Sequence, residues 1–311
     1  MSQAVQRLRT GRDDIDLILG GGLMPGSTIV VAGPPGSGKT VFAHQICFSN
    51  ATVDRPALYY TTWSEPHTKL FRNLSQFAFF DEQAIGERLD VLHLPAIVGE
   101  RGAFQEVADE LLRATVQRRP SIVVIDSSKA LHGLVPEGQL RRMFYELASR
   151  VGQTESVLLL VGEYTPDEIE ESPEFAVADG IVQLGNEPRG LDDRRWIRVL
   201  KMRGSANLPG RHSVSIDQTG FNAFPRLELL VPETVAAEEG RASLGDAGLD
   251  EITHGGLPRG DATMLLGPSG VGKTVLALSF IADGVRRGDA GLYLSFQETP
   301  AELVAKADKL G

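Results

Sequence analysis

The sequence lacks the features that would place the protein in an oxidising compartment or a membrane. It has a single cysteine, Cys47, among 311 residues, so disulfide scaffolds and thiolate metal sites are excluded. The longest apolar run, Val157 to Val161, is far shorter than the roughly 20 residues that cross a bilayer. The stretch from Met1 to Arg9 has no apolar segment of the signal-peptide type. These absences predict a cytoplasmic protein that does not contact a membrane.

Positive charge is also scarce. The chain has 31 Lys and Arg against 41 Asp and Glu, a net charge of −10, which argues against a general basic surface that coats nucleic acid. Its six histidines do not cluster with acids at metal-ligand spacing. A hydrophobic fraction of 42% is still enough for sizeable cores, and the length predicts about two domains.

The most informative stretch is glycine-rich and ends in lysine and threonine. It follows the apolar run 28–32, which predicts a buried parallel strand, and precedes a predicted helix at 41–47. Strand, glycine loop and helix form the context of a P-loop, whose backbone N–H groups and helix N-terminus bind phosphate. In such a loop Lys39 contacts the β- and γ-phosphates, and the Thr40 hydroxyl binds Mg²⁺. The predicted phosphate-binding residues are Gly33, Pro34, Pro35, Gly36, Ser37, Gly38, Lys39 and Thr40.

A second stretch of the same kind ends in Lys273 and Thr274 and follows the apolar run 262–266. The offset from Lys39 to Lys273 also pairs Asp16 with Asp250, so the chain contains an internal repeat. Two nucleotide-binding units in tandem are therefore predicted, with Thr274 as the metal ligand of the second copy. The predicted nucleotide-binding residues of that copy are Gly267, Gly270, Val271, Gly272, Lys273 and Thr274.

Asp126 is a further candidate for the site of the first copy. It ends the apolar run 122–125, and the carboxyl end of a buried strand is where ligands of open parallel sheets bind. A lone Asp at a strand end is also a common turn former. Because this one follows a P-loop, we favour a Walker B acid that holds Mg²⁺ through its water shell.

Alternating strand and helix patterns predict an α/β fold. The expected arrangement is a mainly parallel twisted sheet flanked by helices, with an antiparallel edge. Parallel strands are expected at 28–32, 58–62, 89–94, 122–126, 156–161 and 181–184, helices at 67–80, 103–117 and 140–150, and edge strands at 194–203, 213–216 and 220–224. The predicted domains are a complete unit at 1–228, a linker at 229–243 and an incomplete second copy at 244–311. In that copy, strands are expected at 262–266 and around Tyr293, and a helix at 301–310.

With these pieces placed, nearly the whole chain resembles the KaiC-like branch of the RecA-type P-loop ATPases. The resemblance rests on the paired P-loops, the strand ending at Asp126, and the segment from Val199 to Ser205. It implies ATP and Mg²⁺ as ligands and a hexameric ring with nucleotide between subunits. It also implies that Lys201 and Arg203 reach the γ-phosphate of the neighbouring subunit and stabilise its charge. Without the resemblance, both cations fit a solvated edge strand.

The sequence departs from the family in two places. The family usually carries adjacent acids after the second strand, one of which orients or deprotonates the attacking water. Glu298 fits that position in the second copy, whereas the first copy has Trp63 and Ser64 in register, leaving Glu65 as its catalytic candidate.

The second departure is the end of the chain at Gly311. This end comes before the strands of the second copy that would carry a Walker B acid and the counterparts of Lys201 and Arg203. We therefore expect a fragment of a longer protein or a partial copy that needs a partner. In the family's clock protein the autophosphorylated residues lie beyond this point. Serine/threonine autokinase activity would accordingly belong to a longer form.

Three functions are consistent with these motifs. The leading one is an oligomeric Mg²⁺-dependent ATPase that regulates a partner protein. A nucleotide-gated assembly module with negligible turnover is the second, because the first copy lacks an acid in register. A RecA-like DNA-dependent ATPase is the third, and it needs basic loops. The loop from Glu163 to Glu174 carries only acidic charges, so nucleic-acid binding is not favoured.

Overall fold

The computed structural model describes residues 6–62, 67–94, 104–133, 136–190, 192–230 and 240–308. The chain divides into two compact units, Met1–Leu230 and Val231–Gly311. No helix in these described ranges is long and apolar enough to cross a membrane.

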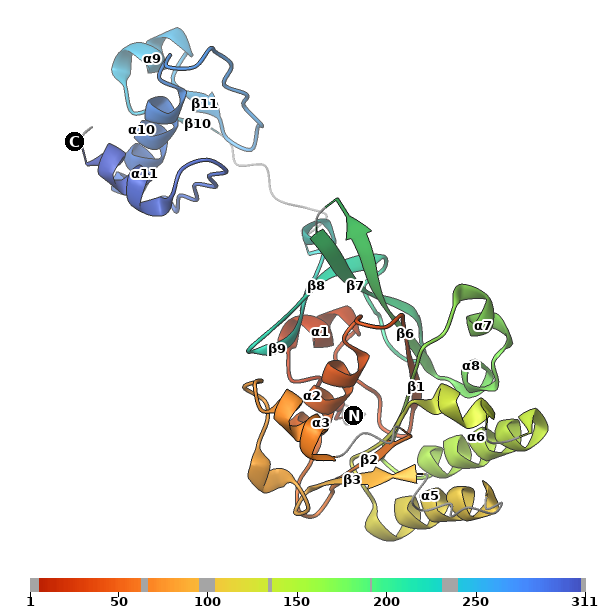
Figure 1. Ribbon diagram of the computed structural model, residues 1–311. Helices are drawn as coiled ribbons and strands as arrows, with labels where there is room; N and C mark the ends of the chain where they lie inside the picture. Colours follow the sequence, from red (N-terminus) through yellow and green to blue (C-terminus); the bar gives the residue numbers. More distant parts are fainter. Residues whose placement is uncertain are drawn as a thin grey trace, which may run out of the picture. The chain divides into compact units, whose positions relative to one another are not determined.

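The first unit is built on one nine-stranded sheet with the order β3-β2-β4-β5-β1-β6-β7-β8-β9 (Figure 1). The neighbouring strands β3, β2, β4, β5, β1 and β6 pair parallel, and the neighbours β6, β7, β8 and β9 pair antiparallel. This arrangement confirms the predicted α/β fold with an antiparallel edge. The strands are β1 (Thr28–Ala32), β2 (Ala57–Thr61), β3 (Leu89–His93), β4 (Ile122–Asp126), β5 (Val157–Gly162), β6 (Gly180–Arg189), β7 (Asp192–Met202), β8 (Arg211–Asp217) and β9 (Gly220–Phe224).

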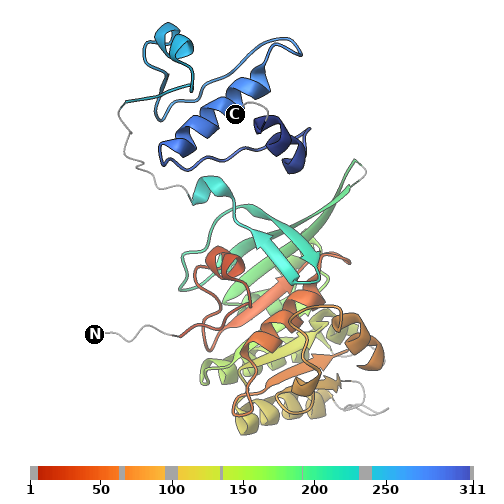
Figure 2. The same ribbon diagram turned by 90° about the vertical axis from the view of Figure 1, so that its left-hand side faces the viewer.

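Helices cover both faces of this sheet. One face carries α1 (Asp13–Ile18), α2 (Lys39–Asn50) and α3 (His67–Leu74) (Figure 1). The other carries α5 (Phe104–Arg118), α6 (Glu137–Gly152), α7 (Pro166–Glu171) and α8 (Pro173–Val177), and Figure 2 shows the same layers from the side. Short 3₁₀ helices connect these elements at η1 (Glu82–Ala84), η2 (Ser128–Gly133) and η3 (Leu227–Leu229).

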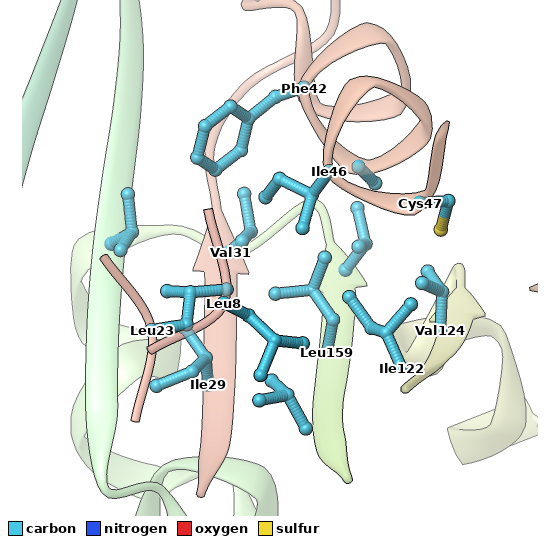
Figure 3. Packing of buried hydrophobic residues seen from close by; sticks show 14 of the residues in the cluster. Leu8, Leu23, Ile29, Val31, Phe42, Ile46, Cys47, Ile122, Val124 and Leu159 are labelled. Carbon is cyan, nitrogen blue, oxygen red and sulfur yellow. The ribbon is translucent and has the colours of Figure 1, made fainter. Parts of the chain in front are cut away.

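Each face of the sheet has its own hydrophobic core. Along β1, Ile29 and Val31 belong to one cluster, and Val30 and Ala32 to the other, because successive side chains of a strand point to opposite faces. A strand buried on both faces reads as a continuous apolar run, which explains why β1 was predictable. Figure 3 shows Phe42, Ile46 and Cys47 of α2 above the central strands. Burial raises the pKa of the Cys47 thiol, so this residue is a core side chain.

The helix predicted at 67–80 is shorter, because α3 ends at Leu74. The backbone N–H of Ala78 donates to the carbonyl of Gln218 in the β8–β9 turn, 2.7 Å away, instead of continuing the helix. Phe79 and Phe80 then pack on Phe48 of α2, with ring centroids 5.7 and 5.6 Å away. The apolar spacing that predicted a longer helix thus continues beyond Leu74, where the backbone leaves the helix and bonds to the β8–β9 turn.

The second unit has β10 (Arg241–Ala242), α9 (Ala247–Ile252), β11 (Leu257–Pro258), α10 (Lys273–Arg286) and α11 (Pro300–Ala307). The predicted strands at 262–266 and around Tyr293 are wrong, since neither segment forms a strand. Met264 and Leu266 are 79% and 81% exposed. In the first unit the equivalent strand β1 is held between β5 and β6. Residues 240–308 contain no counterparts of those two strands, so the apolar run has no sheet to join.

Candidate nucleotide-binding site

The glycine loop of the first unit connects the end of β1 to the start of α2. Gly36 and Gly38 have φ angles of 74° and 94°, in the left-handed region that glycine adopts without penalty. Gly33 lies against the neighbouring strand, and a Cβ there would be 2.4 Å from the carbonyl oxygen of Leu184. Gly38 caps α2 directly before Lys39. The loop therefore has the tight backbone that directs N–H groups toward a phosphate.

Lys39 bends back over this loop. Its Nζ donates to the carbonyl oxygens of Gly33 and Pro34, at 2.9 and 2.8 Å, and lies 3.6 Å from Oε1 of Glu163. Burial lowers the pKa of Lys39, while the negative charges of Glu163 and Asp126 raise it. The ammonium group is thus a buried cation held between a carboxylate and the glycine loop.

Asp126, at the end of β4, faces the same space. Its Oδ2 accepts hydrogen bonds from Thr40 Oγ1 at 2.9 Å and from the Tyr59 hydroxyl at 2.6 Å. Asp126 is 8% exposed, and burial raises its pKa, against the opposing effects of the two hydrogen bonds and of Lys39. The structure therefore brings together three predicted site residues: Lys39, Thr40 and Asp126.

The hydroxyl and carboxylate oxygens of Thr40 and Asp126 are the hard ligands that Mg²⁺ takes. Described residues include no group of three or more His, Cys, Asp or Glu that could hold a metal by themselves. Mg²⁺ is usually bound by one or two protein ligands together with phosphates and waters. These two residues fit a metal that arrives with a nucleotide.

A pocket of about 600 Å³ opens over these groups. It is lined by the P-loop and the first turn of α2, by Tyr59 and Thr61 of β2, by Asp126 and the start of η2, and by Glu163. This combination of a preformed cavity with a few convergent charged groups is typical of a small-molecule site.

Lys201 and Arg203 lie elsewhere. Met202, between them, pairs with Gly180, and Gly180 pairs with Ile29 at the start of β1, whereas the P-loop follows the end of β1. Lys201 donates to the carbonyl of Ala178 at 2.6 Å, and burial lowers its pKa. Arg203 pairs with Asp179 at 3.1 Å and remains 66% exposed. The two cations are therefore on the opposite edge of the sheet from the P-loop of their own chain.

The remaining predictions are Glu65 and the residues of the second copy. Glu65 lies outside the described residues. In the second unit, Lys273 donates to the carbonyls of Gly267 and Pro268, both at 2.8 Å, while Glu298 forms its ion pair with Lys306. Gly270 and Gly272 have φ angles of 82° and 97°. The loop leads into α10, and its predicted nucleotide-binding residues are Gly267, Gly270, Val271, Gly272, Lys273 and Thr274.

Comparison with known families places this site in context. A family model described as "ATPase: KaiC" matches residues 8–228 and 243–311. The chain belongs to the KaiC family of ATPases. The RecA-type α/β fold described above agrees with this membership.

Curated relatives of the KaiC family match the chain almost end to end. The circadian clock oscillator protein KaiC of Parathermosynechococcus lividus is 29% identical over 322 residues, which are 99% of this chain and 59% of the relative. KaiC 1 of Synechocystis sp. is 29% identical over 321 residues, with 99% and 61% covered. KaiC of Rippkaea orientalis is 29% identical over 328 residues, with 100% and 61% covered. The chain thus spans about three fifths of the length of these KaiC relatives.

Sequence reasoning missed several side chains of this KaiC-type site. Tyr59 is 1% exposed, and its hydroxyl donates to Asp126. Arg195 of β7 donates to the carbonyl of Gly36 in the P-loop at 2.9 Å. Lys129 lines the pocket and pairs with Glu168 at 2.7 Å. Glu163 was noted only as the start of an acidic loop. Its place directly after the strand beside β1 is the signal that could have found it.

Proposed function

We propose that the chain binds ATP with Mg²⁺ at the first P-loop and hydrolyses it, as a regulatory KaiC-type ATPase that acts on a partner protein. The observation that carries this proposal is the convergence of Lys39, Thr40 and Asp126 in one pocket. A phosphate-binding loop without an acid at the end of β4 would bind nucleotide but would have no carboxylate for its metal. The single Cys47 agrees with the predicted cytoplasmic location.

Each residue has a separate role in this proposal. The backbone N–H groups of the P-loop bind the phosphates, and Lys39 neutralises the charge on the β- and γ-phosphates. Thr40 and Asp126 would hold Mg²⁺, which would supply positive charge to stabilise the phosphates during transfer. Tyr59 orients the Asp126 carboxylate through its 2.6 Å hydrogen bond. Glu65 is the sequence candidate for the acid that activates water, and Glu298 has that role in the second copy.

We further propose that subunits assemble as a hexameric ring and that Lys201 and Arg203 act on the nucleotide of the neighbour. Their place at the far edge of the sheet supports this, because they cannot reach the P-loop of their own chain. A contact that repeats head to tail around a closed ring would bring that edge to the pocket of the next subunit. Cations there stabilise the γ-phosphate during transfer.

DNA-dependent ATPase activity is less favoured by the charges around the pocket. The charged residues of 163–174 are all acidic, and the nearby Lys129 is already paired with Glu168. This pair, together with hydrogen bonds from Thr165, lowers the pKa of Glu168 to about 2. The segment therefore stays anionic at neutral pH and repels a phosphate backbone.

The proposal is tested by ATP turnover in mixed rings. Lys39→Ala and Arg203→Ala should each abolish turnover. An equal mixture of the two variants should recover about a quarter of wild-type turnover. On average, about one interface in four combines a subunit that has an intact P-loop with a neighbour that has an intact Arg203. Arg142→Ala is the matched control, since Arg142 is an exposed α6 cation paired with Glu146. Assembly is followed by size exclusion in the presence of ATP and Mg²⁺.

Two results would contradict this proposal. Full turnover by Arg203→Ala would show that Arg203 does not act on the neighbour's nucleotide. ATP binding by the wild type without turnover above the Lys39→Ala background would identify a nucleotide-gated assembly module instead of an ATPase.

A further inference from the structure

In the first copy, Trp63 and Ser64 occupy the positions after the second strand at which the family usually carries an acid that activates water. We infer that Glu163, directly after β5, positions the water that attacks the γ-phosphate and accepts its proton. This inference rests on the proposed hydrolysis of ATP and adds a catalytic residue to it.

The sheet places Glu163 between the two motifs that bind the nucleotide. Strand β5 lies between β4 and β1, with Val161 opposite Asp126 and Gly162 opposite Ala32. The next residue along β5 therefore reaches the carboxyl edge between the Walker B acid and the P-loop. Glu163 lines the same pocket as Lys39, Thr40 and Asp126.

The contact with Lys39 places Glu163 at the terminal phosphate. Oε1 of Glu163 lies 3.6 Å from Nζ of Lys39, the group that contacts the β- and γ-phosphates in a P-loop. The Glu163 side chain is 48% exposed, against 9% for Lys39. Water can therefore reach the carboxylate from the open side of the pocket.

The carboxylate of Asp126, the other acid in the pocket, already has hydrogen-bond partners. Asp126 is almost fully buried, and its Oδ2 accepts hydrogen bonds from Thr40 and Tyr59. It is also the proposed metal ligand. Among the described residues that line the pocket, Glu163 is the carboxylate that remains for water. The first copy has Trp63 and Ser64 where the second has Gln297 and Glu298, so an acid from β5 replaces the missing acid after β2.

The step balances without any further reactant. A water proton moves to the Glu163 carboxylate as the water oxygen bonds to the γ-phosphorus. The bond from that phosphorus to the β-phosphate oxygen breaks, and its electron pair leaves with ADP. The products are ADP and inorganic phosphate. Lys39, beside both groups, stabilises the charge on the transferred phosphoryl group.

The test is Glu163→Gln, which keeps the side-chain volume and removes the proton acceptor. We expect kcat to fall about 10²- to 10⁴-fold, the usual contribution of a general base. The Kd for a fluorescent ATP analogue should stay within about threefold of wild type or become tighter, since a negative charge beside the γ-phosphate is removed. Glu163→Asp should retain intermediate turnover. Glu171→Gln, an exposed acid at the end of α7, is the control and should match wild type.

The other outcomes overturn the inference in distinguishable ways. If Glu163 only balances the charge of Lys39, Glu163→Gln binds ATP more tightly with unchanged kcat. Loss of turnover in a parallel Glu65→Gln variant, with turnover retained in Glu163→Gln, assigns the role to Glu65. In both cases hydrolysis itself stands. Absence of turnover in the wild type removes the proposed hydrolysis and this inference with it.

Discussion

The two glycine loops of this chain have the same backbone and different surroundings. Gly38 and Gly272 have φ angles of 94° and 97°, and Gly36 and Gly270 of 74° and 82°. Lys39 and Lys273 donate to the equivalent pairs of carbonyl oxygens, all at 2.8 to 2.9 Å. The conformation of the loop is therefore encoded by about eight residues and needs no sheet beside it.

The pocket is encoded differently. Lys39 lies next to Glu163, which follows β5, and Asp126 at the end of β4, whereas residues 261–272 before Lys273 form no strand and are exposed. Acids reach a P-loop only when parallel strands bring their carboxyl ends to one edge. The comparison indicates that phosphate binding is a local property, while metal binding and hydrolysis depend on the completed sheet.

Asp126→Asn separates phosphate binding from metal binding and hydrolysis within the first unit. The variant keeps the P-loop and removes the carboxylate charge at the end of β4. We expect ATP turnover to fall about 10²-fold, a loss typical of removing one electrostatic stabiliser. The free energy of unfolding should rise by about 1 kcal/mol, because burial disfavours the ionised form of Asp126 and removing such a functional charge commonly stabilises a protein.

Steady-state hydrolysis over a range of Mg²⁺ concentrations and urea unfolding measure the two effects. Asp54→Asn, an exposed acid between α2 and β2, serves as the control. A variant that loses turnover and ATP binding together would show that the loop depends on Asp126, contrary to the comparison.

Gly38→Ala and Gly272→Ala compare the two loops directly. Both glycines have positive φ, which costs an alanine about 1–2 kcal/mol. At Gly38 the new Cβ would also lie 2.4 Å from Cδ1 of Ile216, whereas at Gly272 nothing lies within 4 Å. We expect Gly38→Ala to destabilise by about 2–4 kcal/mol and Gly272→Ala by about 1–2 kcal/mol, measured by hydrogen exchange in α2 and α10.

Gly86→Ala separates the backbone penalty of positive φ from the steric clash with Ile216 inside the first unit. Gly86 has a φ of 80° and open space around it, so only the backbone penalty applies. Equal losses at Gly38 and Gly86 would show that Ile216 moves aside without cost, and that the sheet does not constrain the first loop.

Much of the fold could be predicted from the sequence, because the central strands are buried on both faces. The bounds of β1, β4 and β9 agree with the predicted 28–32, 122–126 and 220–224. The hairpin of β6 and β7 is longer than predicted. Its outer part pairs Glu187 with Arg194 and Asn186 with Arg195, and such polar pairs leave no apolar alternation to recognise.

The parts of the site that were missed depend on strand order. A sequence places Asp126 at a strand end, but not β5 beside β1, and so it does not bring Glu163 to Lys39. The failed prediction at 262–266 has the same origin. Apolar runs indicate what can be buried, and whether burial occurs depends on the neighbours that the topology supplies.

His44 tests whether α2 belongs to a completed core. The imidazole is fully buried and stacks on Tyr59, with centroids 3.9 Å apart, and its Nδ1 donates to the carbonyl of Thr40 at 2.9 Å. Burial lowers its pKa from 6.5 to about 4. The equivalent position in the second copy is Leu278, so His44→Leu gives the first helix the residue of the second.

A depressed histidine pKa means that the unfolded chain binds more protons between pH 6.5 and 4. The stability contributed by neutral His44 is therefore present above pH 6.5 and is lost as the pH falls toward 4. Between pH 7 and pH 5 this loss amounts to about 2 kcal/mol, and His44→Leu should reduce the pH dependence of urea unfolding by that amount. An unchanged pH dependence would mean that the imidazole is solvated. In that case α2, like α10, would not be sealed against a core, and the contrast between the two loops would not extend to the helices that follow them.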